Sequence, residues 1–445
     1  MGLCIIFMLY QAVHILMLPV FGMYLFVRKI KKKSIFGNFK ERMGFVPKVS
    51  REKKSIWIHA VSVGEVLSVQ RLVEQIKKRF PDYACYLTVG TVAGKSVAQK
   101  NIKADYISFL PYDFFLCMWF VYRRIRPQNI IVVEAEIWPN FLMIGKFKKI
   151  PMYLLNARVS TRSEKRLYYL KWFFRPLFNV FTHIYAQSSF DTIQFKRFLK
   201  IPEHKLTLLG NIKAFNVEPK KELAEEILGV TKTDFNTHKK YKILLVGSVH
   251  PGELDVHLKL FKTLKSEHKN LKMILVPRHF HWKDRLVDRV DAMQVPYFLW
   301  DQNTPELQDD RFVLQYISET VLPNYDIMLV CTMGKLFYLY ALADIFFLGG
   351  TFVPVGGHNL LEPAVWAKPV FVGPYYHNCQ DIADQLHDRG ALEKVRTSAE
   401  LQKRVAWILE HEPARKAMGE NASGWLSEQA RSVGAHLDDL FSKIQ

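Results

Sequence analysis

The sequence predicts an α/β protein with two doubly wound domains, preceded by an apolar N-terminal helix. Short runs rich in Val, Ile and Leu alternate with segments whose apolar residues recur at helical spacing, and this series occurs twice in the 445 residues. A polar, charged stretch separates the two series. Continuous apolar strands that alternate with helices indicate parallel sheets covered on both faces. The length fits two or three domains.

The N-terminal segment, residues 1–27, contains no charged residue, and five Lys and Arg residues follow it at positions 28–33. About 20 apolar residues suffice to span the hydrocarbon core as a helix. The positive-inside rule then places the rest of the chain in the cytoplasm. We therefore expect a single transmembrane signal-anchor helix here. A helix that lies in the membrane interface, or packs on the protein, is the alternative.

The first predicted domain covers residues 28–215 and repeats the order of strand, loop and helix. Its strand-led segments, in chain order, are 55–65, 84–99, 106–113, 129–147, 150–160, 183–199 and 206–215. We expect these strands to form one parallel sheet.

The second predicted domain, residues 240–425, follows a linker at 216–239 and precedes a C-terminal helix at 426–445. Residues 301–324 read as an insertion or a hairpin, and the tail from about residue 398 reads as helical. The strand-led segments of this domain are 242–253, 271–280, 325–350 and 356–378.

Composition and motifs narrow the function classes. A net charge of +20 indicates an anionic partner. The five scattered cysteines argue against a disulfide framework and a zinc site. Neither domain contains GxGxxG or GxxxxGK[ST], which argues against a Rossmann dinucleotide site and a P-loop. Two doubly wound domains that face a ligand cleft are, by analogy of fold alone, typical of the GT-B architecture.

Strand ends in the first domain carry charged candidates. Glu65 ends HAVSVGE and would be a general base, or a helix cap. Glu134 and Glu136, in VVEAEIWPN, would position an acceptor or offset positive charge, with a salt bridge to Arg158 as the alternative. Lys213, in GNIKAF, would face a substrate carboxylate or phosphate, or would simply be solvated.

The second domain carries candidates for binding an anion. In GSVHPGE, the N–H groups of Gly247 and Ser248 would face phosphate or sugar, while His250 and Glu253 would contact a donor or cap the helix. Arg278, in VPRHF, suits a nucleotide phosphate, and a surface ion pair is the alternative.

The segment GGHNLLEPA is the strongest of these candidates. We expect a helix that begins near His358 and Asn359, whose first N–H groups form an anion site. Glu362 would accept hydrogen bonds from ribose hydroxyls, and Pro363 is tolerated in a first turn. The segment therefore predicts a site for a nucleotide donor.

Together these motifs resemble the 3-deoxy-D-manno-octulosonic acid (Kdo) transferases over nearly the full length of the chain. The resembling features are the apolar N-terminus, GNFKERMGF, HAVSVGE, LPYD, EAEIWPN, NARVS, GNIKAF, GSVHPGE, VPRHF, TMGKL and GGHNLLEPA. Their order and spacing, taken together, make the resemblance specific.

The resemblance implies roles for individual residues. Glu65 would be the proton acceptor, and Glu134 and Lys213 would stabilise the transition state. The residues implied to contact CMP are Pro277, Arg278, Met333, Gly334, Lys335, Asn359, Leu360, Leu361 and Glu362. The family often has an acid where Lys335 stands, so a backbone contact is expected there.

The resemblance also implies an activity and a location. We expect a metal-independent, inverting GT-B enzyme without a cofactor that transfers Kdo from CMP-Kdo to lipid IVA, or to Kdo-lipid IVA, in lipopolysaccharide biosynthesis. It would act at the cytoplasmic side of the cell inner membrane, on anionic lipids that the aromatic and basic segments 114–124 and 165–178 suit.

No nucleic-acid partner is expected, because the sequence has no RNP, zinc-finger or helix-turn-helix signature. Two alternatives stay open. One is a GT-B enzyme that uses another nucleotide sugar, and the other is a basic, membrane-tethered binding protein without enzymatic activity.

Overall fold

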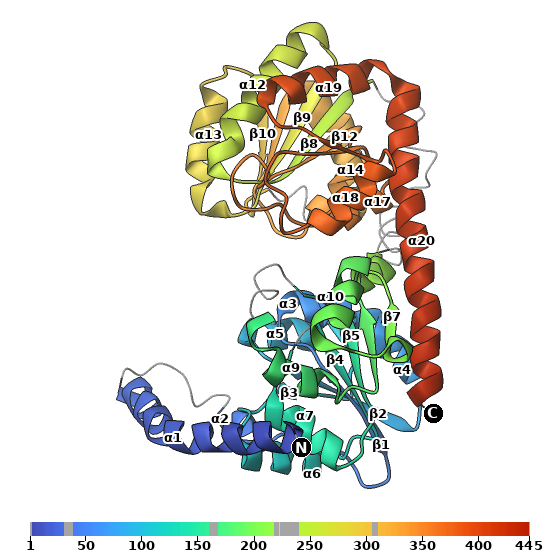
Figure 1. Ribbon diagram of the computed structural model, residues 1–445. Helices are drawn as coiled ribbons and strands as arrows, with labels where there is room; N and C mark the ends of the chain where they lie inside the picture. Colours follow the sequence, from blue (N-terminus) through green and yellow to red (C-terminus); the bar gives the residue numbers. More distant parts are fainter. Residues whose placement is uncertain are drawn as a thin grey trace. The chain divides into compact units, whose positions relative to one another are not determined.

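The computed structural model describes residues 2–30, 39–134, 136–159, 168–217, 222, 240–304 and 310–444. The chain divides into two compact units (Figure 1). The first comprises Met1–Asn216 together with Arg431–Gln445, and the second comprises Val217–Ala430. The predicted linker at 216–239 lies almost entirely outside the described residues.

The first unit contains a seven-stranded parallel sheet with the strand order β3-β2-β1-β4-β5-β6-β7. The strands are β1 (Lys54–His59), β2 (Tyr83–Val89), β3 (Tyr106–Phe109), β4 (Asn129–Val133), β5 (Met152–Ala157), β6 (His183–Ala186) and β7 (Leu206–Leu208). The helices are α2 (Phe39–Arg42), α3 (Val63–Ser68), α4 (Gln70–Arg79), α5 (Val92–Asn101), α6 (Phe115–Ile125), α7 (Pro139–Phe147), α9 (Lys171–Phe178) and α10 (Ser189–Leu199). The predicted doubly wound sheet is confirmed.

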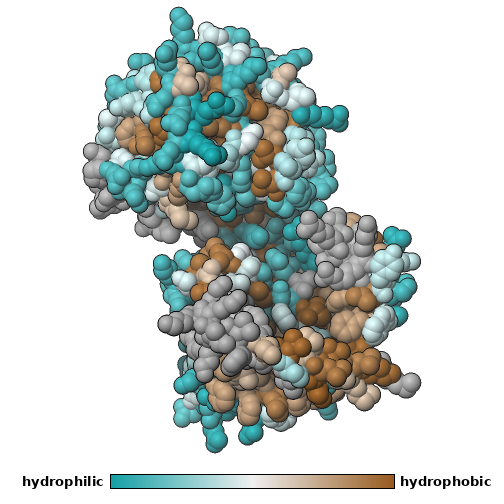
Figure 2. Space-filling view, turned by 90° about the vertical axis from the view of Figure 1, so that its left-hand side faces the viewer, coloured by the Kyte–Doolittle hydropathy of each residue, from teal (hydrophilic) through white to brown (hydrophobic). Residues whose placement is uncertain are grey.

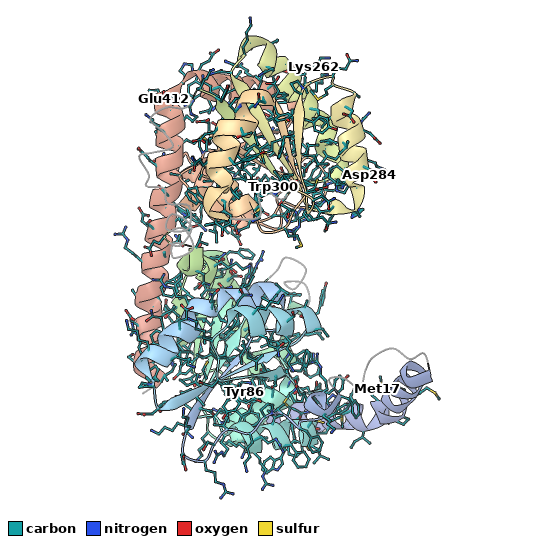
Figure 3. All side chains as sticks on the ribbon, turned by 180° about the vertical axis from the view of Figure 1, so that it is seen from behind. Met17, Tyr86, Lys262, Asp284, Trp300 and Glu412 are labelled. Atoms are coloured by element: carbon teal, nitrogen blue, oxygen red, sulfur yellow. The ribbon has the colours of Figure 1, made fainter. Side chains whose placement is uncertain are left out.

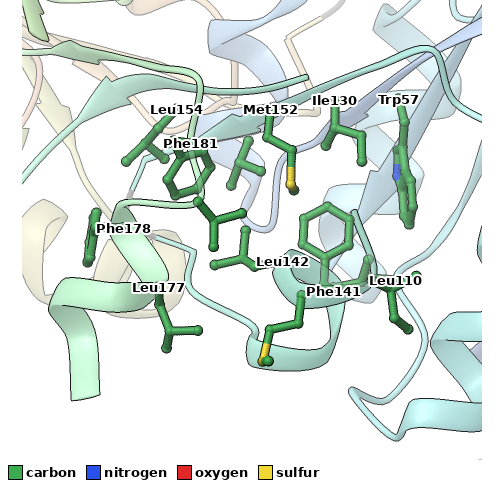
Figure 4. Packing of buried hydrophobic residues seen from close by; sticks show 14 of the residues in the cluster. Trp57, Leu110, Ile130, Phe141, Leu142, Met152, Leu154, Leu177, Phe178 and Phe181 are labelled. Carbon is green, nitrogen blue, oxygen red and sulfur yellow. The ribbon is translucent and has the colours of Figure 1, made fainter. Parts of the chain in front are cut away.

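Each face of this sheet carries its own hydrophobic core, because successive side chains of a strand point to opposite faces. On β1, Trp57 packs into one core, and Ile56 and Ile58 pack into the other. Trp57 meets Phe141 of α7 edge to face, with ring centroids 4.8 Å apart (Figure 4). Tyr86 of β2 lies fully buried within the unit (Figure 3).

Helix α1 (Gly2–Ile30) packs its N-terminal half on the first unit. The Phe7 ring lies edge to face against Phe115 of α6 and Phe147 of α7, with centroids 5.8 Å and 5.9 Å apart. The Tyr10 hydroxyl donates to Asp113 Oδ2 at 3.0 Å. Among the described residues, no helix is both long enough and apolar enough to cross a membrane. The transmembrane anchor therefore stays a prediction.

The second unit is also built on a seven-stranded parallel sheet, with the order β10-β11-β9-β8-β12-β13-β14. The strands are β8 (Lys242–Val249), β9 (Leu271–Pro277), β10 (Tyr297–Trp300), β11 (Ile327–Val330), β12 (Ile345–Leu348), β13 (Val370–Val372) and β14 (Leu392–Lys394). The helices before residue 398 are α12 (Leu254–Glu267), α13 (Lys283–Asp291), α14 (Asp310–Tyr316), α15 (Leu322–Asn324), α16 (Leu336–Leu339), α17 (Leu361–Val365) and α18 (Gln380–Asp388).

Two details of the second unit differ from expectation or add to it. Residues 310–324 are helical, with a π-helical turn at Ile317–Val321. Of the two alternatives for 301–324, the hairpin is therefore wrong for that stretch, and the insertion stays a prediction. Trp300, at the end of β10, is only 2% exposed and lies inside the unit (Figure 3). Within residues 310–324, the apolar side chains at 313, 314, 317, 321 and 322 are buried. This helical spacing explains why the stretch forms helix and not a hairpin.

The tail forms α19 (Ser398–Glu410) and α20 (Glu412–Ile444), which confirms a helical C-terminus. Residues 431–445 belong to the first unit, although the chain reaches them only after completing the second. Tyr185 of β6 donates its hydroxyl to Asp439 Oδ2 at 2.9 Å. Tyr153 of β5 donates to the Lys443 carbonyl at 2.9 Å. The end of α20 thus covers one face of the first sheet.

Candidate active site

In the first unit, the strand order reverses between β1 and β4. Loops that leave neighbouring strands in opposite directions open a crevice at the carboxyl ends of those strands, where ligands of doubly wound sheets bind. Glu65 follows β1 and Glu134 follows β4. The topology therefore brings the two predicted acids to one point.

Glu65 caps the start of α3. Its Oε2 accepts the Val61 N–H at 2.8 Å, and its Oε1 accepts the Ser62 N–H at 3.2 Å. The Ser62 hydroxyl accepts the Glu65 N–H in return at 3.3 Å, which completes a capping box. The capping alternative is thus present in the structure. It also fixes the carboxylate of this residue, which is only 6% exposed, in one orientation.

Glu134 has a left-handed backbone, with φ of +60°. Such a conformation is uncommon for a residue other than glycine, and strained residues of this kind cluster at active sites. Burial raises the pKa of Glu134, and the negative charge of Glu65 raises it further, while Lys213 and Arg158 lower it. The side chains of Glu65, Glu134 and Lys213 therefore act on one another electrostatically, as expected for a shared site.

The expected alternative for Glu134, a salt bridge to Arg158, does not occur in the described part of the chain, where no ion pair joins the two. Glu136 lies beside them. Burial raises its pKa, with Glu65 as the next cause, and a hydrogen bond from Trp138 Nε1 to Oε2 at 3.0 Å lowers it. This region is a cluster of three carboxyl groups, of which Glu65 is buried and Glu134 and Glu136 are partly buried.

Lys213 is exposed and lies in the first turn of a helix that begins at residue 212, next to the sheet. Its N–H donates to Asn211 Oδ1 at 3.0 Å. The neighbouring Ile212 N–H donates to the side chain of Asn156, in β5, at 3.2 Å. Asn156 has φ of +56°, which asparagine adopts more readily than most residues. Sequence reasoning missed this supporting role, although Asn156 belongs to the quoted NARVS segment.

In the second unit, the strand order reverses between β8 and β12. The loops after these strands approach so closely that a Cβ on Gly349 would lie 2.4 Å from the Ser248 carbonyl oxygen. Ser248 itself has φ of +59°. Only glycine fits at 349, because any side chain would overlap the backbone of the β8 loop.

Glu253 ties these two loops together. It is fully buried, and its carboxylate accepts the N–H groups of His250 at 3.0 Å and Phe352 at 3.1 Å, together with that of Gly350. Both oxygens are therefore occupied by the backbone. Of the two alternatives for Glu253, capping is the one that the structure shows.

A pocket of about 310 Å³ opens at the carboxyl ends of β9 and β11. Pro277, Arg278, Met333 and Gly334 line it, which brings four of the predicted donor contacts together. No carboxylate of the described residues pairs with Arg278, so the surface ion pair expected as its alternative is absent there. The exposed guanidinium at a strand end is suited to binding phosphate.

Lys335 does not line this pocket, and its Nζ lies 5.7 Å from the centre of the Trp300 ring. Its aliphatic chain and charge are thus directed at an aromatic face. The expected backbone contact at position 335 stays a prediction.

The GGHNLLEPA segment departs from its prediction. Helix α17 begins at Leu361, later than the expected start near His358 and Asn359, and has only five residues. Asn359 Oδ1 accepts the Leu361 N–H at 3.0 Å, and this local turn competes with the helix. The expected helix start near 358 is therefore wrong, while the anion site in this segment stays a prediction.

Within this segment, Leu360 and Leu361 are buried, so their side chains belong to the core, while Asn359 is exposed and Glu362 is half-buried. His358 Nε2 lies 3.2 Å from His250 Nε2, with the two rings nearly parallel. Burial is the main cause that lowers the pKa of His358 to about 4, and the positive charge of Arg278 contributes to the shift. Sequence reasoning missed this histidine pair, whose members are 108 residues apart.

Within the described ranges, no group of three or more His, Cys, Asp or Glu side chains is arranged to hold a metal ion. The chemistry that the described residues offer is that of carboxylates and a lysine in the first unit, and of an arginine and backbone groups in the second.

Comparison with known families gives one match in each half of the chain. Residues 37–216 match the model described as 3-deoxy-D-manno-octulosonic-acid transferase (kdotransferase), and residues 231–425 match the glycosyl transferases group 1. The chain belongs to the Kdo transferase family. It is therefore a glycosyltransferase, which decides against the alternative of a non-enzymatic binding protein.

Named relatives of this Kdo transferase match most of the chain. A 3-deoxy-D-manno-octulosonic acid transferase of Haemophilus influenzae is 28% identical over 440 residues, 97% of each chain. One of Chlamydia muridarum is 29% identical over 409 residues, 89% of this chain and 88% of that one. In structure, a glycosyltransferase of Rickettsia africae has a TM-score of 0.55 at 11% identity, covers 88% of this chain and 98% of its own, and supports the fold alone.

Proposed function

We propose that this Kdo transferase moves Kdo from CMP-Kdo to lipid IVA, the lipid A precursor, by an inverting displacement that needs no metal. The observation that carries the proposal is the cluster at the crevice of the first unit. There Glu65, Glu134 and Lys213 influence one another, at the place where a doubly wound sheet binds its ligand.

In the proposed reaction, a hydroxyl oxygen of the acceptor forms a bond to the anomeric carbon of Kdo. The bond from that carbon to the phosphate oxygen breaks, and CMP leaves with the electron pair. Glu65 takes the hydroxyl proton. The capping box supports this role, because it holds the carboxylate in one orientation while its remaining lone pairs stay available.

Glu134 and Lys213 are proposed to stabilise the transition state. Glu134 sits in a strained backbone beside Glu65, and Lys213 partly offsets the repulsion between the two carboxyl groups. Preorganised charges of this kind contribute strongly to catalysis. The backbone at Lys213 is fixed before the acceptor arrives, because the side chains of Asn156 and Asn211 accept the N–H groups of Ile212 and Lys213.

In the second unit, Arg278 is proposed to hold the phosphate of CMP-Kdo, and the backbone around Met333 and Gly334 to contact the nucleotide. Support comes from the pocket that these residues line and from the open backbone at Gly334, where no atom of the described residues would lie within 4 Å of an added Cβ. Another nucleotide sugar is the alternative donor, and titration of CMP against UDP separates the two.

We also propose that the enzyme works at the cytoplasmic side of the inner membrane, with residues 1–27 as its anchor. The support is the apolar, uncharged sequence of that segment and the exposed apolar side chains on α1, among them Leu16 at 76% and Met8 at 61%. An acceptor with acyl chains is reached most directly from the membrane surface.

The decisive experiment is Glu65→Gln, assayed for turnover with CMP-Kdo and lipid IVA. Loss of a general base predicts a fall of about 10²- to 10⁴-fold in kcat, whereas CMP affinity measured by calorimetry stays unchanged. Glu74→Gln is the matched control, because Glu74 is an exposed glutamate on α4. Near-normal turnover by a folded Glu65→Gln enzyme contradicts the assignment.

A further inference from the structure

A basic pocket of about 840 Å³ lies at the amino edge of the first sheet. In a parallel sheet each helix returns the chain to the amino ends of the strands, and α6 and α7 both end at this pocket. Glu65 and Glu134 follow the carboxyl ends of β1 and β4. The pocket is therefore at the edge opposite the candidate active site.

The end of α6 contributes three arginines, at 123, 124 and 126. The backbone fixes two of them. Arg124 Nε donates to the Val46 carbonyl at 2.7 Å, and Arg126 Nη2 donates to the Val49 carbonyl at 3.0 Å. Each guanidinium has further N–H groups beyond these bonds. The arginines are thus held in position with donor capacity to spare.

Four further cations complete the lining: Lys148 and Lys149 after α7, and Lys48 and Arg51 before β1. Within the described residues, no acidic side chain lines the pocket and none of its seven cations forms an ion pair. A helix C-terminus attracts cations and explains those that follow α6 and α7. It does not explain Lys48 and Arg51, which belong to no helix.

Exposed aromatic side chains border the pocket. Phe120 lines it, stacks on Phe45 at 6.1 Å, and is 44% exposed. Phe45 and Phe147 are 57% and 54% exposed, and Lys148 Nζ lies 4.6 Å from the ring centre of Trp119. Figure 2 shows hydrophobic residues gathered on the face of this unit that carries α1. Aromatic rings beside Lys and Arg are typical of membrane interfaces.

We propose that this pocket binds the phosphate headgroups of anionic phospholipids, and that the first unit rests on the bilayer through it. The cations match the charge of the headgroups, and the exposed rings match the boundary between headgroups and acyl chains. A free phosphate would need the cations alone. This proposal rests on the membrane location proposed above and names the surface that meets the bilayer, whereas it does not depend on the assigned roles in the transfer reaction.

The test uses Arg123, Lys148 and Lys149, whose side chains are exposed and, among the described residues, donate no hydrogen bond to the backbone. The full-length triple variant R123Q/K148Q/K149Q and the wild type are compared in sedimentation with vesicles of phosphatidylcholine and phosphatidylglycerol, without donor or acceptor. The matched control is K262Q/K269Q/K403Q, which removes three exposed cations from the second unit. Both variants lower the net charge equally.

We expect the pocket variant to bind the anionic vesicles about 10- to 100-fold more weakly, in line with the contribution of surface cations, and the control variant to bind within about twofold of the wild type. Equal losses in both variants would assign binding to net charge and overturn the proposal. Release of the wild type by inorganic phosphate, at constant ionic strength and low millimolar concentration, would also overturn it, because the pocket would then prefer free phosphate.

Discussion

At the scale of single residues, the most informative position is Glu134. A left-handed conformation costs a side-chain-bearing residue free energy that glycine avoids, and burial beside Glu65 adds electrostatic repulsion. No hydrogen bond or ion pair of its carboxylate among the described residues offsets both costs. A residue that is unfavourable for stability and lies at a ligand crevice is best explained by a role in the reaction.

Glu134→Gly should therefore stabilise the first unit while impairing transfer. We expect the free energy of unfolding to rise by about 1 kcal/mol, because glycine relieves the backbone strain, and kcat to fall. Urea unfolding and turnover assays measure the two effects. Lys200→Gly is the matched control, since Lys200 has φ of +50° at the end of α10, away from the site, and should gain stability with unchanged kcat. A Glu134→Gly enzyme with full activity would contradict the role.

Site residues that directly follow a strand could be predicted from the sequence. Residues whose role depends on contact with a residue far away in the chain could not. Glu65, Glu134 and Arg278 all follow apolar strands, so topology alone gathers them at sheet edges. The pairing of His250 with His358 joins residues 108 positions apart. No local pattern encodes that contact, because it arises only after β8 and β12 become neighbours.

At the scale of elements, Asp113 links three segments. Its carboxylate accepts the N–H groups of Asn140 and Phe141, both at 2.9 Å at the start of α7, and the Tyr10 hydroxyl of α1 at 3.0 Å. Burial is the main cause that raises the pKa of Asp113 from 3.8 to about 7, although the backbone bonds lower it. One side chain thus caps a helix and holds α1 on the unit.

This raised pKa predicts a pH dependence of stability. The folded state holds the Asp113 proton up to about pH 7, while the unfolded chain loses it near 3.8. The contribution of Asp113 to the free energy of unfolding is therefore fully present below about pH 4, and it is lost as the pH rises through 7. Urea unfolding between these values should show a slope that Asp113→Asn reduces, by at most about 1.4 kcal/mol per pH unit. The control Asp82→Asn, at an exposed site, should leave the slope of unfolding free energy against pH unchanged. If Asp113→Asn also leaves that slope unchanged, the raised pKa of Asp113 is contradicted.

Element boundaries are harder to predict than element types. The sequence predicts a start of α17 near His358, because glycines followed by polar residues usually lead into a helix. Asn359 instead closes a turn of its own on Leu361, and the helix begins only after that turn. The polar character of residues 301–324 favours an insertion or hairpin, yet the apolar residues within 310–324 recur at helical spacing and are buried accordingly.

At the scale of the whole molecule, the two seven-stranded sheets follow from apolar patterning, but the division of the chain into units does not. The sequence predicts a helix at the C-terminus, and its apolar face is visible there. Which unit that face covers depends on the path of α20 from the second unit to the first. Val433, Leu437, Leu440 and Phe441 all join the core that contains Ile56 and Ile58 of β1.

This path predicts that the first unit cannot do without the last residues of the chain. Truncation after Ala430 removes these four side chains and Ile444, which makes five buried apolar side chains, each worth about 1.5–3 kcal/mol. Together they rival the whole stability of a typical domain, about 5–15 kcal/mol. We expect the truncated protein to lose cooperative unfolding of the first unit, followed by tryptophan fluorescence, and to lose transfer. Calorimetry should still detect the proposed CMP binding, because the pocket at Arg278 lies within the second unit.

In the full chain, Leu437→Ala should lower the free energy of unfolding by about 2–5 kcal/mol. Ser432→Ala is the control, and this change at an exposed position of the same helix should leave the free energy of unfolding unchanged. A truncated enzyme that unfolds and turns over normally would show that the first unit is complete without α20.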